Sequence, residues 1–231
     1  MDARKLLTEG RHALARADLP GLEAEILLGY VLGRNRAWFY ANPEAEVSEA
    51  DVSHYRALLH RRRDGEPVAY LTGVREFWSM ELTVTPDVLI PRPETELLVE
   101  TALELVPADT ACRVADLGTG SGAVALAIAS ERPACEVHAT ELSEAALAVA
   151  RANAQRLAPG RIHFHHGSWC APLRGVFRLV VSNPPYVERG DPHLQRGDCR
   201  YEPRTALTPG DDSLAAIRSI AHEAINGTTM I

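Results

Sequence analysis

The chain has 231 residues, of which 46% are hydrophobic, and its formal net charge at pH 7 is −7. This length supports one main hydrophobic core and a small additional domain, and without an apolar run of about 18 residues or a secretory signal we expect a cytoplasmic protein with no membrane span. The acidic balance disfavours broad nucleic-acid binding, and the four scattered cysteines lack the CxxC spacing of zinc sites, so we expect no direct DNA binding and no metal.

Residues 1–68 have the spacing of amphipathic helices and are predicted to form a small helical bundle. The apolar positions recur three or four residues apart at Leu6, Leu7, Leu14, Leu22, Ile26, Leu27, Tyr30, Val31, Val52, Tyr55, Leu58 and Leu59. The run Arg61–Arg63 follows the last of these helices. At that position the positive charges interact favourably with the helix dipole, and we prefer this role over a contact with RNA.

Residues 69–90 are predicted to be a linker that contains a β-hairpin. Hydrophobic side chains alternate along it, at Phe77, Trp78, Met80, Leu82 and Val84. The remaining residues, 91–231, form the larger predicted domain, and Pro91–Pro93 would start its first helix.

A glycine loop follows the first strand predicted in this larger domain. The short apolar run Arg113–Leu117 precedes it, and a helical stretch begins at Ala123. Alternate glycines allow a tight turn and close approach to a ligand, while the helix N-terminus offers free N–H groups to a carboxylate or phosphate. The GxGxG spacing differs from the dinucleotide GxGxxG, and a P-loop is excluded. The candidate ligand residues here are Gly118, Thr119, Gly120, Ser121 and Gly122.

The next two predicted strands each end at a candidate side chain. The strand Glu136–Thr140 leads to Glu141, at the position where doubly wound folds bind ribose hydroxyls, although Glu141 would equally suit the first turn of the helix 144–157. The strand Arg161–His165 leads to Trp169, which can stack on a purine or serve as an ordinary core aromatic. Three histidines lie nearby, at His163, His165 and His166. We expect them to be solvated or core residues and not ligands of a metal ion.

Asn183-Pro184-Pro185-Tyr186 directly follows the apolar run 177–181. Two prolines stiffen the turn and remove two N–H donors, so its acceptors are held outward. A planar –NH2 group can donate to the Asn183 side-chain oxygen and the Pro184 carbonyl while Tyr186 packs on its face. The alternative is a stiff turn at the end of a buried strand.

These motifs together resemble the peptide chain release factor N5-glutamine methyltransferases. The resemblance rests on Ile90-Pro91-Arg92-Pro93-Glu94-Thr95-Glu96, on Asp116-Leu117 with the glycine loop, on Glu141 and Trp169, and on Ser182 to Tyr186. It covers residues 65–220 closely. The Pro-Arg-Pro-Glu-Thr-Glu segment is the specific element, because Asn-Pro-Pro-Tyr also occurs in adenine-N6 DNA methyltransferases.

The resemblance implies an α/β fold, a Rossmann-like class I methyltransferase with a doubly wound sheet, preceded by a helical domain that docks the substrate. S-adenosylmethionine would have its amino-acid end at Gly118–Gly122, its ribose on Glu141, its adenine on Trp169 and its methyl group facing Asn183. The implied reaction is N5-methylation of the glutamine in the Gly-Gly-Gln motif of release factors. The implied catalytic residues are Asn183, Pro184 and Tyr186, and the substrate-binding residues are these three with Pro185.

Two positions depart from the family pattern. Ser168 stands where an acidic residue usually accepts from the adenine amino group. The helix expected at Ser213–Ala224 is followed only by residues 226–231, which would at most begin a strand, whereas the fold normally continues with two or three strands and a helix. We therefore expect an exposed sheet edge beside the fourth strand, with either marginal folding and weak activity or self-association through that edge.

Three other functions are compatible with these motifs. A glutamine methyltransferase of a ribosomal protein has the same motifs. An adenine-N6 DNA methyltransferase shares the cofactor site and the clamp, as we name residues Asn183 to Tyr186, but it needs a basic groove that accepts a flipped base, for which the chain has little room. A truncated S-adenosylmethionine-binding protein with little activity is the third alternative.

Overall fold

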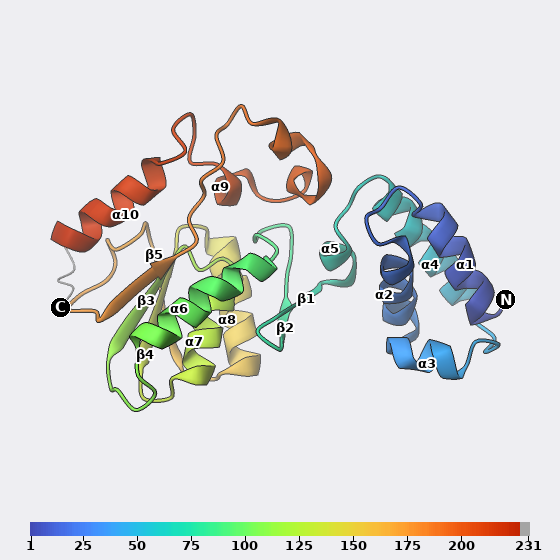
Figure 1. Cartoon of the computed structure of the whole chain (residues 1–231), viewed down its shortest axis with the longest axis horizontal. Helices are drawn as coiled ribbons and strands as arrows, with labels where there is room; N and C mark the ends of the chain where they lie inside the picture. Colours follow the sequence, from blue (N-terminus) through green and yellow to red (C-terminus); the bar gives the residue numbers. More distant parts are fainter. Residues whose placement is uncertain (227–231) are drawn as a thin grey trace. The chain divides into compact units, whose positions relative to one another are not determined.

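The computed structural model describes residues 1–226, which form two compact units, one of Met1–Gly73 and one that begins at Val74 (Figure 1). The division lies within the predicted linker 69–90. Among the described residues, no helix is both long and apolar enough to span a membrane.

The first unit consists of helices. They are α1 (Ala3–Ala13), α2 (Pro20–Leu32), α3 (Arg36–Ala41), α4 (Glu49–Arg63) and α5 (Val68–Thr72). Side chains of Asp2, Asn35 and Ser48 cap α1, α3 and α4 by accepting a backbone N–H three residues on. The core lies between these helices and includes Leu6, Leu27, Leu28, Phe39, Tyr55, Leu58 and Leu59.

The second unit begins with a hairpin of β1 (Val74–Phe77) and β2 (Met80–Thr83). Its two turn residues, Trp78 and Ser79, have φ of 52° and 57°, as in a type I′ turn. Phe77 and Leu82 are buried in the main core of this unit. The hairpin therefore packs as part of the second unit.

The central sheet is parallel and has the strand order β5-β4-β3-β6. Its strands are β3 (Arg113–Leu117), β4 (Glu136–Glu141), β5 (Ile162–His166) and β6 (Leu179–Ser182). The chain adds β4 and β5 on one side of β3 and then β6 on the other. The order thus reverses between β3 and β6, and a ligand site is expected outside the carboxyl ends of strands at such a reversal.

Helices cover both faces of the sheet, as predicted for a doubly wound fold (Figure 1). The helices α6 (Glu96–Leu105), α7 (Ala123–Glu131) and α8 (Glu144–Leu157) pack with Val114, Val137 and Val181 on one face. The helix α10 (Ala215–Asn226) packs on the other, where Ala224 joins Ala115, Leu117 and Phe177. Because α7 is enclosed on all sides, every residue from Ala123 to Ala129 is buried.

Residues 187–210, named here the β6–α10 loop, are folded into short turns. It contains 3₁₀ turns at Pro192–Gln195 and Gly197–Arg200 and the short helix α9 (Arg204–Leu207). Its ends are joined because Val187 N donates to Leu207 O at 3.0 Å and Arg189 N donates to Gly210 O at 2.8 Å. The loop therefore has a closed base beside the end of β6.

The strand β6 lies at one edge of the described sheet. Self-association through this edge stays a prediction. A strand start was expected at residues 226–231; Asn226 is instead the last residue of α10, and residues 227–231 lie outside the described part of the chain.

Asn153 of α8 connects the hairpin to the glycine loop, and its side chain is fully buried. It accepts from Thr83 N at 2.8 Å, and its amide nitrogen donates to Thr83 O and to Ser121 O, both at 2.9 Å. One side chain thus satisfies three backbone groups from two segments. The glycine loop is therefore anchored at Ser121 by a buried side chain of α8.

Asn153→Asp should lower the free energy of unfolding by about 2–4 kcal/mol, because the variant presents a carboxylate to two buried carbonyl oxygens. Urea denaturation followed by circular dichroism measures this loss. Gln155→Glu, the same chemical change on the exposed side of α8, is the control and should change stability by less than about 0.5 kcal/mol. Equal midpoints for the two variants would contradict the anchoring role.

Candidate active site

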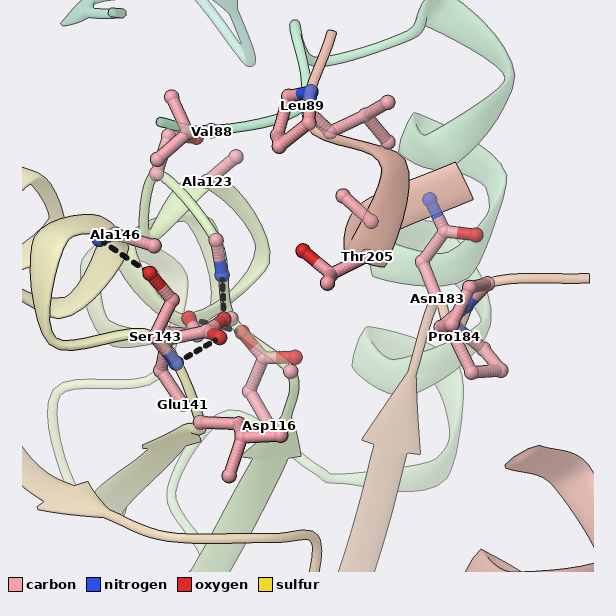
Figure 2. Close-up of a pocket in the computed structure, with 18 of the residues that line it drawn as sticks. Val88, Leu89, Asp116, Ala123, Glu141, Ser143, Ala146, Asn183, Pro184 and Thr205 are labelled. Atoms are coloured by element: carbon pink, nitrogen blue, oxygen red, sulfur yellow. Dashed lines mark hydrogen bonds between the residues drawn. The ribbon is translucent and has the colours of Figure 1, made fainter. Parts of the chain in front are cut away.

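A cavity of about 420 Å³ lies at the carboxyl ends of β3, β4 and β6, where the strand order reverses. Figure 2 shows Asp116 and Glu141 on one side of it, with Asn183 and Pro184 following β6 on the other. The predicted residues that line it are Gly118, Thr119, Gly120, Ser121, Glu141, Trp169, Asn183, Pro184 and Pro185. Gly122 lies behind them as the N-cap of α7.

The glycine loop turns sharply around this cavity. Gly118 and Gly120 have φ of 70° and 56°, a region that residues with a side chain seldom occupy. A Cβ on Gly118 would lie 3.3 Å from the indole ring of Trp169, whereas one on Gly120 would meet nothing within 4 Å. Gly118 therefore permits close packing of Trp169, and Gly120 is required by backbone conformation alone.

Glu141 holds the glycine loop and the start of α8 together. Its Oε2 accepts from Gly120 N at 2.9 Å, and its Oε1 accepts from Ser143 N at 3.0 Å. Both roles considered for this residue are thus compatible, since a carboxylate has about four acceptor sites and two remain for ligand hydroxyls. The backbone donors orient the carboxylate before any ligand binds.

Asp116 is a second carboxylate of the cavity, and no separate role was predicted for it. It is 2% exposed, and its Oδ2 accepts from Thr119 Oγ1 at 2.6 Å and from Ala125 N at 3.2 Å. Burial raises the pKa of Asp116 to about 6, against the lowering effect of these hydrogen bonds. The available signal was an acidic residue within an apolar strand, directly before a glycine loop.

Trp169 and Ser168 form another part of the cavity wall. Trp169 has a φ of 41°, which is rare for an aromatic residue. The preceding Gly167 donates its N–H to Glu141 O at 3.0 Å, so this segment is attached to the end of β4.

The Asn183-Pro184-Pro185-Tyr186 segment leaves β6 at the cavity. Asn183 Nδ2 donates to Thr95 Oγ1 at 3.4 Å. Within residues 1–226, no hydrogen bond engages Asn183 Oδ1 or the Pro184 carbonyl oxygen. Both acceptors remain available for a ligand that carries two N–H groups.

A second cavity, of about 450 Å³, adjoins this segment. Asn183, Pro184 and Pro185 line both cavities, whereas Tyr186 lines only the second and is 60% exposed. The walls of the second cavity include the apolar residues Leu89, Leu98, Val187 and Leu207. Tyr186 is thus placed on the side of the clamp away from the glycine loop.

A buried ion pair joins the β6–α10 loop to the Pro-Arg-Pro-Glu-Thr-Glu segment. Glu202 is 3% exposed; its Oε1 accepts from Ile90 N at 3.0 Å, and its Oε2 accepts from an Arg92 guanidinium N–H at 2.5 Å. Burial raises the pKa of Glu202, while Arg92 acts in the opposite direction. Since Arg92 and Ala206 line both cavities, this pair connects two segments that contribute to the walls of each.

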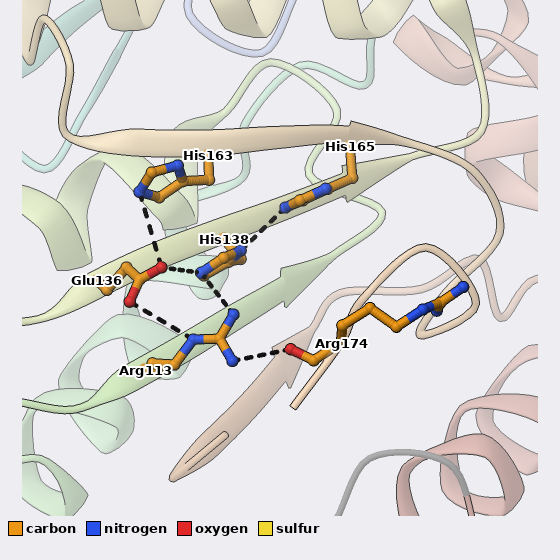
Figure 3. A network of polar contacts seen from close by, with 6 residues as sticks. All are labelled: Arg113, Glu136, His138, His163, His165 and Arg174. Carbon is orange, nitrogen blue, oxygen red and sulfur yellow. Dashed lines mark hydrogen bonds and ion pairs between the residues drawn. The ribbon is translucent and has the colours of Figure 1, made fainter. Parts of the chain in front are cut away.

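The histidines of β4 and β5 lie on the sheet, apart from the cavity. His138 stacks on His163 and His165 with ring-centroid distances of 4.9 and 5.2 Å, and it contacts Glu136 at 2.8 Å and Arg113 at 3.1 Å (Figure 3). Burial lowers the pKa of His138 and of His165. In the described part of the chain, no group of three or more histidine, cysteine or acidic side chains is arranged to bind a metal ion.

Both units of the chain match known protein families. Residues 5–73 match the family description "PrmC N-terminal domain", and residues 93–196 match "Methyltransferase small domain". The protein named release factor glutamine methyltransferase in Escherichia coli K12 is 48% identical over 227 residues, which are 98% of this chain and 82% of that protein. The proteins of that name in Bordetella pertussis and Coxiella burnetii are 53% and 50% identical, over 90% and 89% of this chain and 77% and 74% of their own lengths.

Asp116→Asn should change how stability depends on pH. Between pH 3.8 and about 6 the folded wild-type chain binds a proton at Asp116 that the unfolded chain does not, so its stability relative to the variant falls as the pH rises. The slope should approach about 1.4 kcal/mol per pH unit and flatten above that range. Urea denaturation of both proteins from pH 4 to pH 8 measures this; a pH-independent difference would contradict the raised pKa.

Glu202→Gln and Arg92→Gln should be coupled. Each single variant leaves one partner of the pair without its counter-charge, so we expect losses of about 1–3 kcal/mol each and a double variant at least about 1 kcal/mol less destabilised than their sum. Chemical denaturation of all four proteins measures the coupling. The exposed pair Arg189 and Asp211, 3.5 Å apart, is the control and should give less than about 0.5 kcal/mol. Additive losses at Arg92 and Glu202 would show that the pair does not join the two segments.

Proposed function

The chain belongs to the family of release factor glutamine methyltransferases, and from this premise we propose that it transfers a methyl group from S-adenosylmethionine to the side-chain amide of a glutamine in peptide chain release factors. The observation that carries the proposal is the position of Asn183 and Pro184. Their free acceptor oxygens lie where one cavity, suited to the cofactor, meets a second, suited to the substrate.

The residues of the first cavity fit the proposed cofactor. Glu141 keeps acceptor capacity for ribose hydroxyls, Trp169 offers an aromatic surface for adenine, and the residues Gly118–Gly122 would hold the amino-acid end. The nearly buried carboxyl of Asp116 suits a ligand that carries positive charge. S-adenosylmethionine, when bound, supplies an electrophilic methyl group on a positively charged sulfur.

Asn183 and Pro184 are proposed to hold the accepting amide. Asn183 Oδ1 and the Pro184 carbonyl would each accept one N–H of the glutamine side chain, which fixes the direction of its nitrogen. An amide nitrogen is a weak nucleophile, because its lone pair is delocalised. Two acceptors on its hydrogens favour the positive charge that develops on nitrogen during transfer, and the proton can leave afterwards without a strong base.

The second cavity favours the uncharged side chain of glutamine as the substrate. Its walls at Leu98, Val187 and Leu207 can contact methylene groups, and Tyr186 lies beside the clamp. Among the described residues that line it, Arg92 is the single arginine and is paired with Glu202, while Glu94 adds a negative charge. This arrangement supports a protein amide over a flipped DNA base, since binding duplex DNA would require unneutralised positive charge along a groove.

The helical unit is proposed to dock the protein substrate. Residues 5–73 match the PrmC N-terminal domain, and the docking role is the one that the family resemblance implies for this unit. A ribosomal protein with an accessible glutamine remains the competing substrate, because the clamp itself recognises only the amide group.

Asn183→Ala should reduce the turnover number by about 100- to 1,000-fold, because it removes one of the two acceptors on the reacting amide. Transfer of labelled methyl groups to a release factor measures this, and a release factor with alanine in place of the glutamine of Gly-Gly-Gln should stay unlabelled. Gln195→Ala removes an exposed amide from the β6–α10 loop and should retain wild-type turnover.

The same assay with a ribosomal protein and with duplex DNA separates the alternatives. Labelling of the release factor alone is the expected result. Labelling of DNA alone would refute the proposal. Labelling of the ribosomal protein alone would refute the release factor as the substrate and identify the ribosomal protein in its place. Cofactor binding without labelling of any acceptor would indicate a binding protein.

A further inference from the structure

We propose that Glu223 of α10 positions Trp169 and so sets the affinity for the cofactor. This inference rests on the proposed cofactor site, in which Trp169 contacts the adenine. It gives a ligand-related role to a helix that contributes no residue to the lining of either cavity among the described residues.

The backbone of Trp169 is held in an unfavourable conformation. Its φ of 41° is disfavoured for any residue with a Cβ, and it persists only where the surroundings enforce it. Strained backbone of this kind is concentrated at ligand sites, and Trp169 lines the first cavity. The contacts that enforce the conformation therefore bear directly on the shape of that cavity.

Glu223 supplies one of these contacts from 53 residues away in the sequence. Its Oε2 accepts from Cys170 N at 3.0 Å, which is the peptide N–H directly after Trp169. Ile220 and Ala224, on the same side of α10, belong with Trp169 and Cys170 to one apolar cluster. The helix thus holds this peptide by a charged hydrogen bond and by packing.

Contacts with β4 and with the glycine loop also restrain Trp169. Gly167 N donates to Glu141 O at 3.0 Å and fixes the start of the segment to β4. Gly118 brings its Cα so close to the indole that a Cβ there would lie 3.3 Å from the ring. A local turn also restrains this backbone, because Ala171 N donates to Ser168 O at 3.0 Å. With the indole against Gly118, Glu223 adds a side-chain contact to the peptide directly after Trp169.

The prediction is that Glu223→Met raises the dissociation constant for S-adenosylmethionine about fivefold, as expected for the loss of one hydrogen bond that organises the site. Methionine keeps the length and helix propensity of glutamate but accepts no comparable hydrogen bond. Glu223→Gln retains an acceptor and should bind within about twofold of wild type. Ser219→Ala, on the exposed side of α10, is the control and should bind as wild type does.

Isothermal titration calorimetry gives the dissociation constants, and amide hydrogen exchange gives a second measurement without cofactor. Exchange at Cys170 should accelerate in Glu223→Met and stay slow in Glu223→Gln. If Glu223→Met does not fold, Glu223→Ala serves as the variant that lacks the acceptor, with thermal unfolding as the check of folding.

Combination with Trp169→Ala separates this inference from the proposed function. We expect Trp169→Ala to weaken binding and to abolish any further effect of Glu223→Met. If Trp169→Ala binds weakly and Glu223→Met binds as wild type does, the inference is overturned while the proposed cofactor site stays intact. The same conclusion follows if the two changes weaken binding independently of each other. Wild-type binding by Trp169→Ala would instead refute the placement of the cofactor against Trp169.

Discussion

The buried pair of Arg92 and Glu202 is the interaction on which the shape of the candidate site most depends. It joins two segments 110 residues apart, and each carries walls of both cavities. Burying a carboxylate is costly, and its attraction to one guanidinium seldom compensates fully. Here Ile90 N supplies a second hydrogen bond to Glu202, and the partial exposure of Arg92 reduces the cost on its side. The pair therefore specifies geometry more than it adds stability.

Two other acidic residues of the site are also held by hydrogen bonds from the backbone. Asp116 and Glu141 each accept backbone N–H groups and keep acceptor capacity for the cavity. With Asn183 Oδ1 and the Pro184 carbonyl, the cavity is rich in acceptors. Such a surface selects ligands that donate hydrogen bonds or carry positive charge, and S-adenosylmethionine and a primary amide have these properties.

The features that were predictable from the sequence depend on neighbouring residues. Strand, glycine loop and helix are adjacent at Arg113–Glu131, and the structure confirms the α/β class and the parallel sheet. The roles of Glu202 and Asn153 were not predictable, because the partners of Glu202 lie 110 and 112 residues away and Thr83, a partner of Asn153, lies 70 residues away. Hydrophobic periodicity carries no information on which loop carbonyl or N–H a distant polar side chain will meet.

Selection of an amide over a carboxylate follows from the proposed clamp without any further residue. A glutamate side chain has the shape of glutamine but, when ionised, offers only acceptors to Asn183 Oδ1 and the Pro184 carbonyl. Two oxygens would then face two oxygens in a partly dehydrated site, and both unpaired groups would carry a desolvation cost. A lysine ammonium could donate but lacks the planar geometry that two fixed acceptors favour. The rigidity that the prolines give this segment is therefore a source of specificity as well as of rate.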